Sequence, residues 1–493
     1  MWCSGSAGAL ISRLKYPFFY LLTLAALAAL LSFVFLKGER LEIGRHVVAA
    51  STDKAIWDQF REAFKASLHH PIAVFLAQIA AIILVARSLG WLCRRIGQPA
   101  VIGEIVAGIL LGPSLMGWVA PEFSKALFPP QSFTYLQYLS QVGLILFMFV
   151  IGSELDLTTL RHNAQDAIVI SHVSIVLPFG LGAALAYFAY AEYAPPHVQF
   201  MSFALFMGIG MSITAFPVLA RIVQERNLQR TRLGTIAITC AAADDVTAWC
   251  ILAIVIALVK AGTMLSALFT VALAVLYVLF MILAVKPALT MLVKKRTANG
   301  ELSQDVMAIL LLMLVASAYA AEVIGIHALF GAFMAGVIIP ERGTLSRLFA
   351  GKVEDISLLL LLPLFFVFTG LRTQIGLLGQ SSLWLMTLAI LGVAIFGKFF
   401  GSALAARYVG QSWRDSLTIG ALMNTRGLME LVVLNIGYDL GVLTTEIFSM
   451  MIVMALVTTF MTGPAISLIE KIFPVAQATD ADPLGAKASG QKT

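Results

Sequence analysis

Apolar residues in this chain are grouped in long blocks, separated by short polar or charged loops. Most blocks run for about 18–25 residues, enough for a helix to cross a hydrocarbon core of roughly 30 Å. The block at 327–340 is shorter, but it is counted as a span because basic loops would otherwise not fall on the same side of the membrane. The pattern predicts an all-α polytopic membrane protein with about 13 core transmembrane helices plus one N-terminal span. The blocks lie at 16–36, 71–93, 99–117, 135–153, 167–190, 199–222, 234–259, 264–286, 304–324, 327–340, 355–371, 382–407, 416–437 and 443–470.

The composition excludes a soluble domain. Of the 493 residues, 60% are hydrophobic and 12% are charged, whereas soluble domains carry roughly twice that share of charge. The net charge of +6 comes from basic residues in loops after every second block, so it indicates membrane orientation and no nucleic-acid partner. These loops, and with them the C-terminus, are predicted to face the cytoplasm, and we expect a bacterial inner (plasma) membrane. The residues include Arg94, Arg95, Arg226, Arg230, Arg232, Lys294, Lys295, Arg296, Arg342, Arg347 and Lys352.

Three regions are expected along the chain. Residues 1–70 hold the first apolar block and a charged extracytoplasmic link. That block is a signal peptide or an uncleaved anchor, and its long apolar core favours the anchor. Residues 71–473 form the transmembrane domain, and the polar residues 474–493 are predicted to be a short disordered cytoplasmic tail.

Three motifs recur in the same order about 210–230 residues apart. "GEIVAGILLGP" (103–113) resembles "ALFGAFMAGVIIP" (328–340), and "LFMFVIGSELDL" (146–157) resembles "LFFVFTGLRTQI" (364–375). "MSITAFPVLA" loosely resembles "LMNTRGLMEL". Units at 99–259 and 327–470 would each hold five spans in opposite orientation. Inverted repeats of this kind are frequent in secondary transporters.

Two spans contain residues that interrupt a helix. Thr214 and Pro217 lie in one, and Asn424 and Thr425 lie in the matching span of the second unit. Proline removes a backbone donor, and Asn and Thr side chains compete for backbone hydrogen bonds. A plain kink explains a lone proline, but two matched interruptions predict a crossed pair of discontinuous helices, the kind of element that forms ion sites.

Six ionisable residues lie within apolar blocks, where each costs about 2.5–3.5 kcal/mol on insertion scales. They must therefore pair, lose their charge or bind ions. The residues are Glu104, Asp244, Asp245, Lys398, Arg426 and Glu430.

Asp244 and Asp245 are consecutive, so on a helix they diverge by about 100°. One can face a cavity and bind a proton or a hard cation, while the other faces a neighbouring helix. Lys398 is expected to pair with Asp244, either as a releasable bridge or as a structural pair. Arg426 is expected to brace the interrupted helix by pairing with Glu430, four residues on, or alternatively with Glu104.

Other functions find little support in the sequence. There is no phosphate-binding glycine loop, nucleotide motif or metal-ligand spacing, so no cofactor and no enzymatic activity are expected. The residues fit a secondary antiporter that exchanges protons for Na⁺ or K⁺. The alternatives are a cation channel or an ion-sensing membrane protein on the same scaffold.

"AADDVTAW" (242–249), "GEIVAGILLGPSLMG" (103–117) and the segment 423–464 resemble the monovalent cation:proton antiporter-2 family, which includes plant cation/H⁺ exchangers and their bacterial relatives. The resemblance covers about residues 71–470. It implies an inverted-repeat fold in which a mobile core moves past a dimer domain like an elevator, and hence a homodimer. It also implies that Asp245 alternately holds cation and proton beside an Asp244–Lys398 pair, with Thr214 and 424–426 at the helix crossover.

Overall fold

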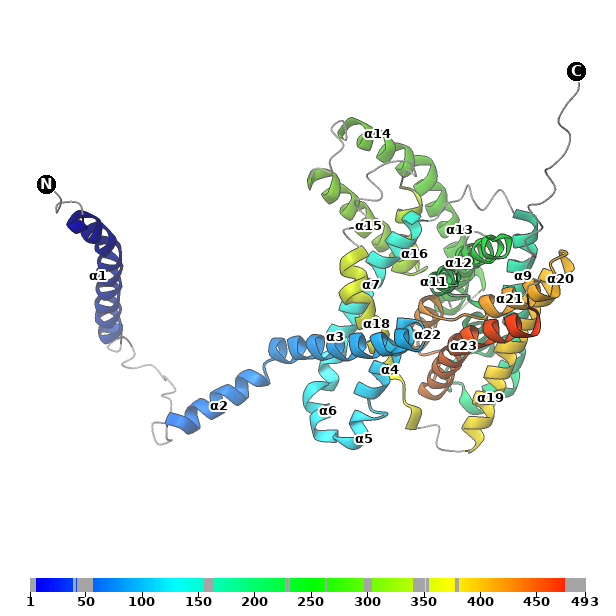
Figure 1. The fold of residues 1–493 in the computed structure, drawn as a ribbon, viewed down its shortest axis with the longest axis horizontal. Helices are drawn as coiled ribbons and strands as arrows, with labels where there is room; N and C mark the ends of the chain where they lie inside the picture. The colour runs from blue at the N-terminus through cyan, green and yellow to red at the C-terminus, as the bar shows by residue number, and fades with distance from the viewer. Residues whose placement is uncertain are drawn as a thin grey trace, which may run out of the picture. The chain divides into compact units, whose positions relative to one another are not determined.

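The computed structural model describes residues 6–38, 41, 56–154, 164–226, 228, 231–261, 264–296, 304–339, 351, 354–376 and 381–474. Within these residues the regular structure is entirely helical (Figure 1). Two compact units are present, Met1–Leu68 and His69–Thr493. The predicted disordered tail, apart from Pro474, and the basic residues Arg230, Arg342, Arg347 and Lys352 lie outside the described residues.

The described part of the first unit includes the helices α1 and α2. α1 (Ser6–Gly38) includes a candidate membrane span at Phe19–Gly38. α2 (Ile56–Leu68) lies in the segment that the sequence predicts only as a charged link. Its polar residues interrupt the apolar run, so the length of apolar blocks does not predict this helix, although its aromatic residues recur at helical spacing.

The second unit holds the remaining spans. Its helices are α3 (Pro71–Arg95), α4 (Ala100–Leu111), α5 (Met116–Val119), α6 (Pro121–Leu127), η2 (Pro130–Ser132), α7 (Phe133–Glu154), α9 (Ala164–Tyr193), α10 (Phe200–Ser212), α11 (Phe216–Glu225), α12 (Arg232–Ala261), α13 (Met264–Phe280), η3 (Met281–Val285), α14 (Lys286–Arg296), α15 (Gln304–Ile324), α16 (Ala328–Val337), η4 (Ser357–Leu361), α18 (Leu362–Arg372), α19 (Ser381–Ile395), η6 (Phe396–Phe400), α20 (Gly401–Tyr408), α21 (Trp413–Met423), α22 (Leu428–Asp439) and α23 (Thr445–Ile472).

Among the described residues, 12 helices are long and apolar enough to cross a membrane, or 13 when the bent pair α21–α22 counts as one span. The predicted polytopic all-α class is therefore confirmed. The expected span at 327–340 contains α16, a helix of only 10 residues. At 1.5 Å per residue α16 is about 15 Å long, roughly half of a hydrocarbon core.

Glycines allow several helices to pack at backbone distance. A methyl group added to Gly108 in α4 would lie 2.1 Å from the Val367 carbonyl oxygen of α18, and one added to Gly336 in α16 would lie 2.2 Å from that of Phe149 in α7. No side chain fits at such distances, so small residues set these interfaces. Gly397, next to Lys398, packs closely on α9, where an added methyl group would lie 2.9 Å from the Cα atom of Pro178.

Candidate functional site

Two helix breaks meet in the middle of the second unit. Residues 213–215 separate α10 from α11, and residues 424–427 separate α21 from α22. The Ala215 amide donates to the Thr425 carbonyl oxygen at 3.0 Å. Each break leaves backbone groups without an intrahelical partner, and this hydrogen bond pairs a donor from one break with an acceptor from the other. A methyl group on Gly427 would lie 3.0 Å from side-chain carbons of Ala215 and Val218, which is tighter than ordinary side-chain packing, so the two breaks pack closely here.

Pro217 lies at the start of α11 and does not kink a continuous helix. The first turn of a helix has no intrahelical partner for its amides, so proline is tolerated there. The interpretation of Pro217 as a plain kink is thereby excluded. In the other break, the Thr425 hydroxyl donates to the Leu422 carbonyl at 2.8 Å, and the buried Asn424 side-chain oxygen has no hydrogen-bond partner within the described ranges.

Asp244 and Asp245 of α12 have different surroundings. Asp244 is fully buried and accepts hydrogen bonds from the hydroxyl groups of Ser171 at 2.6 Å, Ser174 at 3.0 Å and Thr214 at 2.7 Å. Asp245 is 3% exposed, and neither of its carboxylate oxygens has a hydrogen-bond partner among the described residues. The two adjacent acids therefore differ as their divergence on the helix predicts.

Lys398 completes the surroundings of Asp244. It lies in η6, a π-helical turn, and such turns are frequent at functional sites. Its ammonium group lies 3.2 Å from Asp244 Oδ2 and also donates to the carbonyl oxygens of Ser174 and Ser212. All three ammonium protons are therefore used, and the ion pair expected from the sequence is formed.

Arg426 holds the two breaks together. Its guanidinium group donates to the carbonyl oxygens of Gly210, Met211 and Ile213, at the C-terminal end of α10. A cation there balances the negative end of the helix dipole. Arg426 also lies 3.7 Å from Glu430 Oε2. Within the described residues, this is the carboxylate it pairs with, so the alternative pairing with Glu104, a buried residue of α4, is wrong.

Several of these partners were not predicted from the sequence. Ser171 and Ser174 are three residues apart in a mostly apolar span, so they share a helix face, a signal visible in the sequence. The Thr459 hydroxyl of α23 accepts a hydrogen bond from the Arg426 backbone amide at 3.0 Å and donates one to the Arg426 carbonyl oxygen at 2.8 Å. No sequence pattern predicts this pairing.

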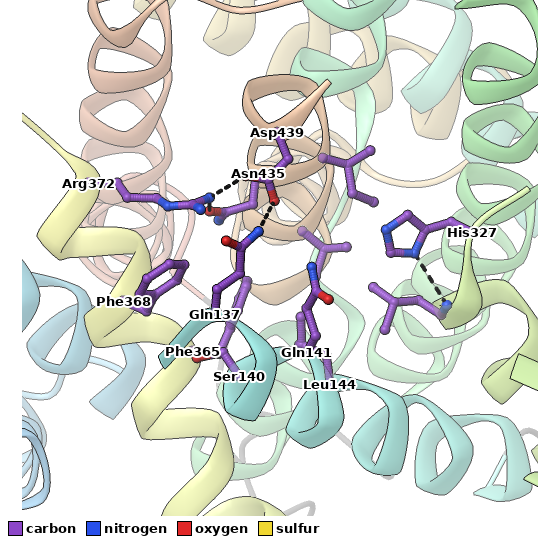
Figure 2. A pocket seen from close by; sticks show the side chains of 13 residues that line it. Gln137, Ser140, Gln141, Leu144, His327, Phe365, Phe368, Arg372, Asn435 and Asp439 are labelled. Atoms are coloured by element: carbon purple, nitrogen blue, oxygen red, sulfur yellow. Dashed lines mark hydrogen bonds and ion pairs between the residues drawn. The ribbon is translucent and has the colours of Figure 1, made fainter. Parts of the chain in front are cut away.

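A second polar cluster lines a cavity of about 30 Å³ between α7, α18 and α22 (Figure 2). Arg372 Nη1 donates to Asp439 Oδ1 at 2.8 Å and to Asn435 Oδ1 at 3.1 Å, and Gln137 Nε2 donates to Asp439 Oδ2 at 3.1 Å. The cavity has room for about two water molecules. Leu144, Phe365 and Val432 also line it, so the cluster links three helices around a cavity that is partly apolar.

Comparison with known proteins identifies the family. The family model described as "Sodium/hydrogen exchanger, transmembrane" matches residues 80–471. The chain belongs to the sodium/hydrogen exchanger family. The resemblance stated from the sequence is therefore confirmed, and this exchanger is a secondary transporter and not an enzyme.

Curated relatives agree with the family. The exchanger is 42% identical over 404 residues to the Na⁺/H⁺ antiporter NhaS4 of Synechocystis sp., covering 82% of this chain and 98% of NhaS4. It is 40% identical over 416 residues to Cation/H⁺ antiporter 17 of Arabidopsis thaliana and 33% identical over 409 residues to K⁺/H⁺ antiporter 1 of Saccharomyces cerevisiae. These matches cover 84% and 81% of this chain but 50% and 46% of the plant and yeast proteins.

A solved structure shows the same fold. The sodium proton antiporter MjNhaP1 from Methanocaldococcus jannaschii at pH 8 aligns with a TM-score of 0.62 at 12% sequence identity. The alignment covers 82% of this chain and 99% of MjNhaP1. At this identity the match supports the helical architecture alone.

Proposed function

We propose that this exchanger moves Na⁺ or K⁺ against protons across its membrane, and that Asp245 binds the cation and the proton alternately. Antiport of a monovalent cation against protons follows from its homology to Na⁺/H⁺ and K⁺/H⁺ antiporters. The role of Asp245 rests on one observation: neither oxygen of its buried carboxylate has a hydrogen-bond partner in the part of the chain that the structure describes.

A buried carboxylate without partners is unstable as a bare anion, because desolvation is not repaid by hydrogen bonds. Asp245 must therefore carry a proton or a cation, and the two compete for the same oxygens. Asp244 does not face this choice, because Lys398 and three hydroxyl groups balance it. We infer that Asp244 shapes the site and that Asp245 exchanges its ligand.

Both helix breaks contain side-chain oxygen atoms that are suited to binding a hard cation. The Asn424 side-chain oxygen is buried and has no hydrogen-bond partner among the residues that the structure describes, and Thr214 and Thr425 supply hydroxyl groups. Carboxylate, amide and hydroxyl oxygens are the ligands that hard cations prefer. We propose that Asp245 is the principal ligand, with Asp244 and the break residues around it, while Arg426 and Glu430 brace the breaks.

Reciprocal contacts support inverted repeats. Gly108 of the first repeat (99–259) packs on Val367 of the second repeat (327–470), and Gly336 of the second repeat packs on Phe149 of the first. A twofold relation between the repeats predicts such an exchange of contacts. Gly103 against Leu89 and Gly331 against Ser317 repeat the same hairpin packing 228 residues apart, which extends the proposed repeat to α3 and α15. In this arrangement α16, though short, is a full member of the second repeat.

We propose that transport follows an elevator-type movement of a core containing α12, η6 and the two breaks against a dimer domain. The Arg372–Asp439 ion pair joins α18 to α22. In this proposal it would hold the core and the dimer domain together on one side of the membrane. The homodimer, the cytoplasmic C-terminus and the bacterial inner membrane belong to the same proposal, supported by the family resemblance and by the charge of the loops.

The test is proton movement in proteoliposomes that contain a pH-sensitive dye, after addition of Na⁺, K⁺ or Li⁺ in turn. The wild type should respond to Na⁺, K⁺ or both, and the Asp245→Asn variant should give no response while melting at a similar temperature. Glu122→Gln, at an exposed position, is the matched control and should keep full activity. Full exchange by Asp245→Asn would exclude the proposed role of this carboxylate.

A further inference from the structure

We propose that α2 lies along the membrane surface, with its aromatic face in the boundary between lipid headgroups and acyl chains. This inference concerns a helix outside residues 80–471, the part of the chain that the family model matches. It does not depend on the proposed ion site.

The aromatic residues of α2 form one stripe. Trp57, Phe60 and Phe64 are spaced three and four residues apart, which places them on one helix face together with Leu68. The rings stack along the helix, with centroids 5.6 Å apart for Trp57–Phe60 and 5.9 Å apart for Phe60–Phe64. They are nevertheless 68%, 56% and 54% exposed, so the described residues of the first unit leave a large apolar stripe uncovered.

The other face of α2 is polar and carries Asp58, Glu62 and Lys65, while Arg61 lies at the edge of the stripe, beside Leu68. Aromatic residues on one side and charges on the other are typical of helices that lie in the plane of a membrane interface. Because the charges balance, adsorption would depend on the apolar stripe, and zwitterionic lipid would suffice as the partner.

Chain connectivity selects lipid as the occupant. α2 ends at Leu68, and the span Pro71–Arg95 begins three residues later. Three residues reach at most about 10 Å, so the end of α2 stays close to the point where that span enters the bilayer. At its other end, residues 39–55 connect α2 to the span Phe19–Gly38. A helix of 13 residues tethered to spans on both sides has the lipid surface within reach along its length of about 20 Å.

The test uses the full-length protein in phosphatidylcholine vesicles with brominated acyl chains, which quench nearby tryptophan. The emission of Trp57 is obtained as the difference between the wild type and the Trp57→Phe variant. The matched control carries Trp57→Phe with Ala66→Trp, because Ala66 lies on the opposite face of α2. Acrylamide on both sides of the vesicle measures exposure to water.

We expect the Trp57 emission to be shifted to shorter wavelength and to lose intensity in brominated lipid, while the tryptophan at position 66 is quenched mainly by acrylamide. Replacing Phe60 and Phe64 with serine should weaken the lipid quenching of Trp57. Quenching of Trp57 by acrylamide alone would place α2 in water and overturn the proposal. Protection from both quenchers would show that the stripe is covered by protein, either the transport unit or a second copy of the chain, and would equally overturn it.

Discussion

Lys398 and Asp244 form an ion pair with 3.2 Å between Nζ and Oδ2, and both side chains are fully shielded from solvent. The pair joins η6 to α12, and the Lys398 hydrogen bonds to the Ser174 and Ser212 carbonyl groups add α9 and the end of α10. Four separate segments are therefore joined at one ammonium group. Such a pair is not strongly stabilising against an apolar alternative, but breaking it by removing one partner is costly.

Lys398→Ala is expected to lower the stability of the protein by about 3–5 kcal/mol, because Asp244 is left buried without its counter-ion. Adding Asp244→Asn to the same chain should recover part of the loss. Thermal unfolding in detergent measures both effects, together with the pH profile of exchange, which should change more than the preference among cations. Lys125→Ala, which removes an exposed ion pair with Glu122, is the control and should leave the melting temperature unchanged. An unaltered pH profile and melting temperature for Lys398→Ala would reject the role of the pair.

The sequence predicted the spans and the positions of the helix breaks because both follow local rules. Apolar length predicts a membrane helix, and Pro217 or Asn424 in such a block predicts an interruption. The pairing of Lys398 with Asp244 was also accessible, because an isolated charge in lipid requires a partner.

Contacts set by tertiary packing could not be predicted in this way. Arg426 binds three carbonyl groups at the C-terminal end of α10, more than 200 residues away in sequence. Every residue has a backbone carbonyl group, so the identity of these residues does not indicate that they bind Arg426. The Arg372–Asp439 pair was missed because both residues lie near predicted span ends, where charges are common. α2 was missed because its polar face breaks the apolar run, although the spacing of Trp57, Phe60 and Phe64 was visible.

Arg426→Gln is expected to destabilise the protein by about 3–5 kcal/mol, because it uncaps α10 and leaves Glu430 buried without its partner. Arg226→Gln is the matched control, since Arg226 also binds a carboxylate and a carbonyl but is partly exposed. That change should cost no more than about 1 kcal/mol. The melting temperatures of the two variants check the difference, and equal shifts would contradict the capping role of Arg426.

His327, between α15 and α16, should make stability depend on pH. Burial lowers the pKa of this imidazole below its usual value of 6.5, with the Lys260 ammonium acting in the same direction and the carboxylates of Glu322 and Asp439 opposing it. The unfolded chain then binds a proton at higher pH than the folded chain does. Stability attributable to His327 is therefore constant above about pH 7 and falls as the pH drops through 6.5.

Melting temperatures of the wild type and of His327→Gln, measured between pH 5 and pH 8, check this dependence. Glutamine does not titrate, so the wild type should lose more stability on acidification than the variant. His172→Gln is the control, because its ring lies on another helix, with Nδ1 2.8 Å from the Ile168 carbonyl oxygen. Parallel curves for the wild type and His327→Gln would show that the imidazole has no such effect.

The Arg372–Asp439 pair should control access to the cavity between α7 and α22. A charge-assisted hydrogen bond contributes about 1.5–3 kcal/mol, and a loss of about 1.4 kcal/mol changes an equilibrium tenfold. In the Arg372→Gln variant, a cysteine introduced by Gln141→Cys should therefore react faster with a water-soluble maleimide than in the Arg372 background. Gln131→Cys, at an exposed position, is the control and should react equally in both. The native cysteines are subtracted by labelling each background without an introduced cysteine. Unchanged labelling at position 141 would show that the ion pair does not hold this side closed, since access would then be limited by the apolar packing of Leu144, Phe365 and Val432.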